Sequence, residues 1–365
     1  MNRVLQVVAD GRAGGGSSHV LQLCRSMADG GLDVHLLTER DSHVESQAAT
    51  VGLNVSGLPF FRAGRLDPRL WLDVGRLMRR LAPSVIHAHG ARGALPIAAS
   101  RMWPGSGRSP FVYTVHGYHF LAKRKAARRL AASAERFCSR SADRTVFVCE
   151  HDRAIARRWH FLQSSRAGDV IYNGIDLSDL PSHRPPERFA MAFLGRLTPQ
   201  KNPLMLADIM ERLRDLPVDL RIIGDGDLRD ELEGRVAAKG LADRVLITGE
   251  LSRTEALREL SRCHALILPS RWEGLPIAVL EAMAMGVVAV TSAVGGLTEM
   301  IEPGKSGWLI SPEDIDGFAH AVRTLARDRD LAAGMAENAK RLVLDRFAWD
   351  RTLEAHLSLY QRLMV

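Results

Sequence analysis

Cysteine and long apolar runs are scarce in this sequence. Four of the 365 residues are cysteine, and none stands at the close spacing of a metal-binding pair. That number is too small for a disulfide scaffold, so we expect a reduced, cytoplasmic protein. The first apolar run, residues 4–9, ends at Asp10 and is too short for the core of a signal peptide. The most apolar later stretch, residues 275–294, is interrupted by Glu281 and other polar residues, so we expect no transmembrane helix.

Aromatic residues are also sparse, at 6% of the chain. Hydrophobic residues nevertheless make up 46% and charged residues 25%, which is the balance of a folded globular protein. A chain of 365 residues exceeds what one ordinary hydrophobic core supports. We therefore expect two domains.

The net charge of +7 is unevenly distributed along the chain. Residues 1–185 contain 26 Lys and Arg against 15 Asp and Glu, a net charge of +11, whereas the remainder contains 23 against 27, a net charge of −4. The first half is therefore expected to face an anionic partner. Nucleic acid is disfavoured because the sequence has no helix-turn-helix, RNP or zinc pattern. An anionic membrane surface or a phosphate-bearing lipid fits this charge.

Short apolar segments alternate with stretches of helical periodicity along the whole chain. The expected strands of the first half are residues 4–8, 34–38, 85–89, 111–116 and 145–149. The alternation resumes after a proline-rich segment with residues 189–194, 220–223, 245–247, 265–268 and 287–290. This pattern predicts an α/β protein with two doubly wound parallel-sheet domains joined near residue 183. The last helical stretch, residues 347–364, is expected to cross back to the first domain.

Two glutamates occupy unequal places in the stretch 270–286. Pro276 suits the first turn of a helix and Gly286 the residue just past its end, so Glu273 lies in the entering loop and Glu281 inside the helix. The helix lies between two expected strands, where open parallel sheets bind ligands, and a phosphate fits its N-terminus. A solvated loop glutamate and a charged residue on an amphipathic helix are the alternative.

Two features of the first half stand at expected strand ends. Gly14, Gly15 and Gly16 follow the first strand and let a ligand approach the backbone, although a dinucleotide fingerprint is not satisfied because His19 takes its third glycine position. They cradle a diphosphate, abut an acceptor, or form a flexible turn. His116 ends the strand 111–116 and faces the same edge, either as a functional imidazole or as a structural hydrogen-bonding residue.

A basic helix is predicted over residues 121–144. Its expected apolar stripe is mostly alanine, and basic residues fill its other sides: Lys123, Arg124, Lys125, Arg128 and Arg129. Such a helix either docks on an anionic membrane or binds phosphate. The remaining interpretation is a solvated face over a buried stripe.

The second half pairs Arg196, at a strand end, with Lys201. A guanidinium fork and an ammonium point charge together suit the oxygens of a leaving diphosphate where no metal acts. Gly224 and Gly226 flank another strand-to-loop turn, with room for a base or a ribose.

These motifs together resemble family 4 glycosyltransferases of the GT-B fold. The resemblance covers nearly the whole chain, in order: the glycine turn at 14–16, His116-Gly117, the segment 173–176, Gly195-Arg196 through Pro203, the turn 224–226, and Glu273 with Glu281 in a Gly-Leu-Pro context. The run 113–120 is similar to the bacterial branch that builds exopolysaccharide, O-antigen or glycan-linkage units on polyprenyl-diphosphate acceptors. Leu275 stands where many members carry Phe.

The resemblance implies two Rossmann-like domains facing a central cleft. The first, residues 1–182, would be the acceptor side and would be joined by the C-terminal helix 346–365; the second, residues 183–345, would bind the nucleotide sugar. The implied reaction moves a hexose-type sugar from a UDP- or GDP-linked donor to a lipid-linked glycan acceptor with retention of configuration. The implied course is front-face displacement, with no metal and no other cofactor.

The resemblance also implies the roles of individual residues. Arg196, Lys201 and Gly16 would bind the donor diphosphate, and Glu281 the ribose hydroxyls, beside Gly224 and Gly226. Glu273 would contact the donor sugar and His116 the sugar and the reacting region. The basic residues 123–129 would meet the acceptor or the membrane.

We therefore expect a peripheral enzyme at the cytoplasmic face of the membrane. A sugar-nucleotide epimerase or a transferase with a soluble acceptor keeps the same fold. A non-catalytic sugar-nucleotide-binding scaffold is disfavoured because Arg196, Lys201, Glu273 and Glu281 are all present.

Overall fold

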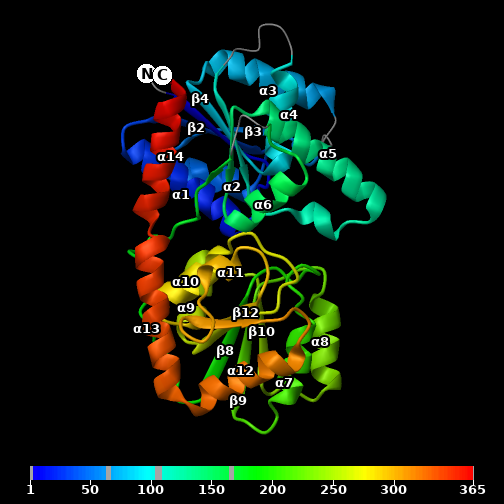
Figure 1. Cartoon of the computed structure of the whole chain (residues 1–365), viewed down its shortest axis with the longest axis vertical. Coiled ribbons are helices and arrows are strands. Elements are labelled where there is room, and N and C mark those ends of the chain that lie inside the picture. Colours follow the sequence, from blue (N-terminus) through cyan, green and yellow to red (C-terminus); the bar gives the residue numbers. More distant parts are fainter. Residues whose placement is uncertain (1–2, 63–66, 103–108, 164–167, 365) are drawn as a thin grey trace. The chain divides into compact units, whose positions relative to one another are not determined.

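The chain forms two compact units in a computed structural model that describes residues 3–62, 67–102, 109–163 and 168–364 (Figure 1). Unit 1 comprises Met1–Asn173 and Thr352–Val365, and unit 2 comprises Gly174–Arg351. Each unit has a parallel sheet with helices on both faces, so the predicted fold class is confirmed. No helix in the described part of the chain is long and apolar enough to span a bilayer.

The division between the units falls at residue 174, not at the expected 183. The proline-rich segment that suggested a linker packs on unit 2, where the backbone N–H of Arg184 donates to Ser261 O at 2.9 Å. The imidazole Nε2 of His183 lies 2.9 Å from Cys263 O. The C-terminal segment also joins unit 1 later than expected, at Thr352 and not at residue 346.

Unit 1 contains a seven-stranded parallel sheet of order β3-β2-β1-β4-β5-β6-β7. The strands are β1 (Arg3–Val8), β2 (Asp33–Glu39), β3 (Asn54–Leu58), β4 (Val85–His89), β5 (Phe111–Val115), β6 (Arg144–Phe147) and β7 (Asp169–Val170). The sequence analysis missed β3 and β7. β3 is a half-exposed edge strand of mixed composition, and β7 has two residues, so neither carries a hydrophobic run.

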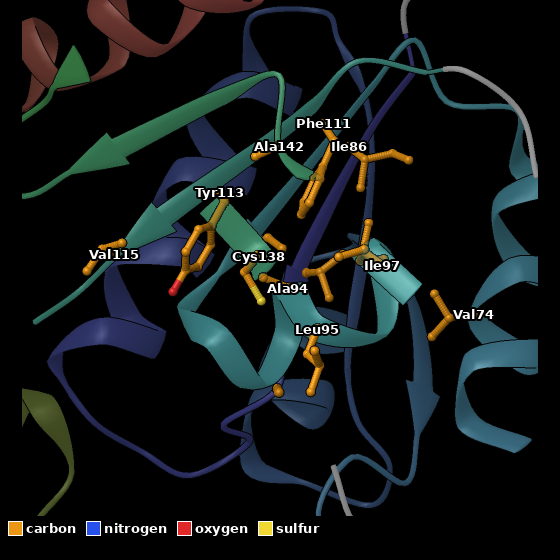
Figure 2. Packing of buried hydrophobic residues seen from close by; sticks show 14 of the residues in the cluster. Val74, Ile86, Ala94, Leu95, Ile97, Phe111, Tyr113, Val115, Cys138 and Ala142 are labelled. Atoms are coloured by element: carbon orange, nitrogen blue, oxygen red, sulfur yellow. The ribbon is translucent and has the colours of Figure 1, made fainter. Parts of the chain in front are cut away.

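Helices cover both faces of the unit 1 sheet. They are α1 (Gly15–Asp29), α2 (His43–Thr50), α3 (Pro68–Leu81), α4 (Gly90–Ser100), η1 (His119–Ala122), α5 (Lys125–Ser141), α6 (Glu150–Arg158) and most of α14 (Trp349–Met364). Figure 2 shows part of the core, where strand residues such as Ile86, Phe111 and Tyr113 pack with Ile97 of α4 and Cys138 of α5.

Unit 2 contains a six-stranded parallel sheet of order β10-β9-β8-β11-β12-β13. The strands are β8 (Phe189–Leu194), β9 (Val218–Ile223), β10 (Val245–Gly249), β11 (Ala265–Leu268), β12 (Val288–Ser292) and β13 (Gly307–Ile310). The helices are α7 (Met205–Arg212), α8 (Arg229–Ala238), α9 (Arg253–Ser261), α10 (Ile277–Met285), α11 (Leu297–Met300), α12 (Ile315–Arg327) and α13 (Arg329–Arg346). α10 packs against α9, α13 and strands β11 and β12.

The helix α10 begins and ends where its residue types require. Pro276 is the N-cap and precedes the first helical residue, Ile277, whereas the sequence analysis placed Pro276 in the first turn; its φ is −72° and its ψ an extended 121°. Gly286 ends the helix in the left-handed region at φ 85°, which L side chains rarely adopt. Glu273 therefore lies in the loop before the helix, and Glu281 lies inside it, as the sequence predicted.

Candidate functional site

The candidate site of unit 2 lies at the carboxyl ends of its two central strands. From β8 the chain proceeds outward to β9 and β10 on one side, whereas β11, β12 and β13 extend the sheet on the other. Neighbouring β8 and β11 therefore send their following loops in opposite directions, which is the topological switch point where open α/β sheets bind ligands. Lys201 follows β8 and Glu273 follows β11.

Lys201 and Glu273 form an ion pair at this switch point. The Nζ atom of Lys201 lies 2.6 Å from Oε1 of Glu273, and the two side chains are 17% and 5% exposed. Burying both charges costs desolvation free energy, which the short contact offsets only in part. An ammonium group has three donors, so two remain for a bound anion while the third stays on Glu273. The pair thus presents a fixed cation beside a fixed carboxylate.

Hydrogen bonds join the loops around this pair. The N–H of Leu197 donates to Asp225 O at 2.9 Å, which links the loops after β8 and β9. The N–H of Arg271 donates to Gln200 O at 2.8 Å, which links the loops after β8 and β11. The N–H of Gly296 donates to Gly274 O at 2.9 Å, which adds the loop after β12. Four strand-end loops therefore support one another.

Three glycines allow these loops to approach so closely. A Cβ atom on Gly295 would lie 1.9 Å from the carbonyl oxygen of Glu273, and φ at Gly295 is +54°. A Cβ atom on Gly224 would lie 2.2 Å from the carbonyl oxygen of Gly195. Gly224, which the sequence analysis placed beside a base or ribose, therefore also makes room for the neighbouring loop. A Cβ on Gly226 would likewise meet the backbone of Leu197, at 2.6 Å.

Glu281 is a buried carboxylate with a cationic partner. It is 6% exposed, and its Oε1 atom accepts from Nη2 of Arg253 at 2.9 Å. Burial raises the pKa of the Glu281 carboxyl above its ordinary value, and the guanidinium of Arg253 opposes that rise. Arg253 is the first residue of α9, and the sequence analysis did not find it.

Arg196 is exposed, and among the described residues its side chain forms no hydrogen bond or ion pair. It follows β8 directly after Gly195, on the same loop as Lys201. Its guanidinium is therefore available to an anionic ligand of unit 2.

Gly16 and His116 belong to unit 1. Gly16 lies in the first turn of α1, and a Cβ atom on it would meet nothing within 4 Å. The helix begins after Gly14 without a side-chain cap. His116 follows β5 and is half-buried, and its Nε2 atom lies 3.0 Å from Nδ1 of His89 at the end of β4.

The basic segment differs from the predicted helix 121–144. Lys123 and Arg124 precede α5, which begins at Lys125. Arg128 is half-exposed, whereas Lys123, Arg124, Lys125 and Arg129 are exposed. The expected apolar stripe is buried only toward the end of the helix, and Leu130, assigned to that stripe, is 71% exposed. The first turns of α5 therefore place an exposed leucine among basic side chains.

Within the described ranges, no group of three or more His, Cys, Asp or Glu side chains could hold a metal ion. Arg196, Lys201 and Arg253 are cations of unit 2 that follow its strands β8 and β10.

Sequence comparison gives a consistent classification. The family model of glycosyl transferases group 1 matches residues 178–342, and that of Glycosyltransferase Family 4 matches residues 13–179. The chain is 26% identical over 318 residues to the UDP-Gal:alpha-D-GlcNAc-diphosphoundecaprenol alpha-1,3-galactosyltransferase of Escherichia coli, covering 82% of this chain and 80% of that protein. It is 30% identical over 296 residues to the alpha-D-kanosaminyltransferase of Streptomyces kanamyceticus, covering 74% and 75%.

Structure comparison agrees with the sequence matches. HepE of Anabaena, solved in complex with UDP and glucose, superposes with a TM-score of 0.85 at 19% identity, covering 99% of this chain and 100% of that one. The fold is that of a GT-B glycosyltransferase. The chain belongs to the family 4 glycosyltransferases.

Sequence reasoning missed several polar residues near the expected ones. His87 and His89 alternate within an otherwise apolar strand, so both face one side of the sheet. That spacing was a usable signal for a polar cluster. The sequence contains no comparable signal for Arg253 or Tyr360. Arg253 lies in an ordinary charged helix, and Tyr360 lies in an amphipathic helix at the end of the chain.

Proposed function

We propose that this glycosyltransferase moves a hexose from a nucleoside-diphosphate sugar to a polyprenyl-diphosphate-linked glycan, with retention of configuration, in bacterial surface polysaccharide synthesis. The observation that carries the proposal is the Lys201–Glu273 ion pair at the switch point of unit 2. A UDP or GDP donor supplies the diphosphate that the cation would bind. The name of the Escherichia coli relative, which contains a UDP-linked donor and a diphosphoundecaprenol acceptor, supports the choice of substrates. The UDP and glucose bound to HepE support a nucleotide-sugar donor.

In this proposal the donor diphosphate binds Lys201 and Arg196. Lys201 is held by Glu273, so its charge is in place before the donor arrives and costs little reorganisation during transfer. Arg196 is exposed and can close on the second phosphate as a bidentate donor. Lys201, held in advance, and Arg196, placed by the phosphate it binds, together stabilise the leaving nucleoside diphosphate, so the chemistry needs no metal or other cofactor.

The two glutamates bind different groups of the donor. Glu273 has one carboxylate oxygen on Lys201, and its other oxygen can accept a hydroxyl of the donor sugar. Glu281 has one oxygen on Arg253, and its other oxygen can accept the ribose hydroxyls.

Unit 1 supplies Gly16 and His116 in the proposed reaction. Gly16 brings exposed backbone at the start of α1 to the donor diphosphate. His116 contacts the sugar and the reacting region and orients the acceptor hydroxyl. In a front-face displacement the departing phosphate oxygen accepts the acceptor proton, so His116 acts by position and electrostatics.

The basic segment 123–129 would bring the enzyme to the cytoplasmic face of the membrane. Its exposed cations suit anionic headgroups or the diphosphate of the lipid-linked acceptor, and the exposed Leu130 suits the interface.

A panel of nucleotide sugars tests the donor half of this proposal. Binding and slow donor hydrolysis are measured with UDP-, GDP- and other nucleoside-diphosphate sugars in the absence of acceptor. Saturable binding of one nucleotide series, lost in Lys201→Met, is the expected result. Conversion of the nucleotide sugar to an epimer without acceptor would instead identify an epimerase, and no binding in any series would overturn the proposed donor.

A further inference from the structure

A chain of buried polar side chains crosses the centre of the unit 1 sheet. Gln6 of β1, His87 and His89 of β4, Thr114 of β5 and Tyr360 of α14 are each at most 5% exposed. β1 and β4 are neighbours at the switch point of this sheet, because β2 and β3 extend it on one side and β5, β6 and β7 on the other. The chain of side chains therefore lies below the edge where His116 stands.

Each of these groups has a hydrogen-bond partner. Nε2 of His89 lies 2.9 Å from Oε1 of Gln6, and Nε2 of Gln6 lies 2.9 Å from the Tyr360 hydroxyl. That hydroxyl lies 2.5 Å from Nδ1 of His87, whose Nε2 lies 2.6 Å from Oγ1 of Thr114. Buried polar groups are costly unless paired, and these pairs remove much of that cost.

The orientation of the Gln6 amide determines which group donates and which accepts in each hydrogen bond of this network. Its Nε2 atom also lies 3.6 Å from Sδ of Met27, a weak acceptor that suits an N–H and not a carbonyl oxygen. The amide nitrogen therefore faces Met27 and Tyr360, and the amide oxygen faces His89. An oxygen acceptor requires His89 to carry its proton on Nε2.

Burial keeps the histidines of this chain neutral. It lowers the pKa of His87 and His89 well below the ordinary value, and the neighbouring imidazoles lower it further. A neutral imidazole has one donor and one acceptor, so a proton on Nε2 of His89 leaves Nδ1 as the acceptor. The contact of 3.0 Å then requires Nε2–H of His116 to donate to Nδ1 of His89.

The same direction extends to the C-terminal helix. The Tyr360 hydroxyl accepts from Gln6 and must therefore donate to Nδ1 of His87, which leaves the proton of His87 on Nε2, facing Thr114. His356, one turn earlier in α14, stacks at 5.5 Å from His87 with its pKa lowered by burial to about 4. Two residues of α14 thus pack on the histidines of β4.

We infer that Gln6 is a positioning residue that fixes the Nε2–H tautomer of His89 and thereby requires Nε2 of His116 to donate, which sets the orientation of the His116 ring. The His89 and His116 rings, with centroids 5.3 Å apart and planes at 29°, restrict rotation of His116 further. The tautomer of His89 follows from its hydrogen bonds and its burial, whereas the consequence for transfer rests on the proposed role of His116.

Nitrogen-15 NMR of the imidazoles in the full chain, with labelled histidine, tests the assignment directly. The wild-type protein is expected to show His87, His89 and His116 protonated on Nε2. A dominant Nδ1–H tautomer at His89 would mean that donors and acceptors are reversed along this hydrogen-bond network, and it would overturn the inference.

Gln6→Met removes both hydrogen-bonding ends of the amide at similar volume. We expect His89 and His116 to lose their single dominant tautomer, and kcat for transfer to fall by about 10-fold to 100-fold with little change in KM for the donor. Tyr360→Phe should disturb His87 and leave the His89–Gln6 bond intact. Tyr113→Phe is the matched control. It deletes a buried tyrosine hydroxyl of the same sheet that bonds to Glu135 and takes no part in the hydrogen-bond network of Gln6 and His89.

The readouts separate the inference from the proposed function. An unchanged His116 spectrum in Gln6→Met would overturn the positioning role, whatever the rate. A changed spectrum with an unchanged rate would support the positioning role and overturn the part of His116 in transfer. If Gln6→Met does not fold, the wild-type spectrum and that of Tyr360→Phe still decide which imidazole nitrogens donate in the hydrogen-bond network.

Discussion

Nη2 of Arg253 lies 2.9 Å from Oε1 of Glu281, so a partly exposed cation at the start of α9 pairs with a buried carboxyl group of α10. The Arg253 side chain is 44% exposed and the Glu281 side chain 8%, so solvent screens the cation more than the anion. Burial raises the pKa of the Glu281 carboxyl, and the guanidinium of Arg253 opposes that rise.

Arg253→Ala is expected to destabilise the enzyme more at neutral pH than at mildly acidic pH. The pKa of Glu281 is already raised by burial, and removal of Arg253 raises it further. A carboxyl group with a raised pKa in the folded state loses stability as pH rises from its unfolded pKa toward its folded pKa. We expect a loss of about 1–3 kcal/mol at neutral pH, the cost of an unpaired buried group, measured by urea unfolding.

The double variant Arg253→Ala, Glu281→Gln is the control for that loss. It removes the buried charge together with its partner, so much of the lost stability should return. An equal loss at both pH values, with no recovery in the double variant, would show that Arg253 stabilises the fold through packing alone.

Lys201→Met and Glu273→Gln should distinguish the residue that binds the donor diphosphate from the residue that contacts the donor sugar. Lys201→Met removes a charge-assisted hydrogen bond to phosphate and should weaken both the free nucleotide and the nucleotide sugar, on the order of 10-fold to 100-fold. Glu273→Gln keeps an oxygen that accepts from Lys201, so nucleotide affinity should persist while transfer falls. Calorimetric titration with the nucleotide and the nucleotide sugar measures both; equal loss of nucleotide affinity in the two variants would contradict the division of roles.

Gly295→Ala should disrupt the site through the backbone of Glu273. The added Cβ would lie 1.9 Å from the Glu273 carbonyl oxygen, so the loop after β11 must move. We expect a loss of about 3 kcal/mol or more, since strain and a steric clash act together, measured by thermal or urea unfolding. Gly304→Ala is the matched control, because φ is +75° there but nothing lies within 4 Å of its Cβ. A similar loss in both variants would assign the effect to φ alone.

Changing Lys123, Arg124 and Lys125 together to Ser should weaken co-sedimentation with anionic liposomes. Each basic residue near such a surface contributes about 1 kcal/mol, and the contribution falls as salt screens it. The matched control changes three exposed arginines of α3 in unit 1: Arg69, Arg79 and Arg80. Unchanged sedimentation in the first variant, or an equal loss in the control, would remove the membrane role of the 123–129 segment.

Leu130→Ser addresses the apolar part of the same surface. Its side chain is 71% exposed, so the substitution should cost the fold little. Reduced binding to liposomes at high salt, where charge is screened, would show that the leucine enters the interface.

The sequence predicted the elements that carry strong local signals. The buried strands around His116 and Glu273, and the helix between Pro276 and Gly286, follow from hydrophobic runs and terminal residues. The edge strand β3 was missed because it is half-exposed and lacks such a run. The edge strand β13 was missed although it contains three apolar residues, because it is only four residues long. The unit boundary was misplaced because the prolines before β8 indicate an irregular segment but not the unit on which it packs.

The candidate site was predictable only as a set of residue types at strand ends. The contact between Lys201 and Glu273 spans 72 residues, and the contact between Gln6 and Tyr360 spans 354, so sequence spacing does not encode either one. Gly224 illustrates a second limit, since the sequence predicted room for a ligand there but did not show that a neighbouring loop also packs against this glycine.

The contact of Gly295 with Glu273, and of Gly224 with Gly195, bears on any attempt to redesign the donor preference of this enzyme. Because the strand-end loops of unit 2 touch backbone to backbone, a loop transplanted from a relative brings a main-chain path that its new neighbours do not match. Exchange of single loops should therefore yield poorly folded hybrids. Side-chain substitution on the existing loops, or transfer of all four together, is the compatible route to a new specificity.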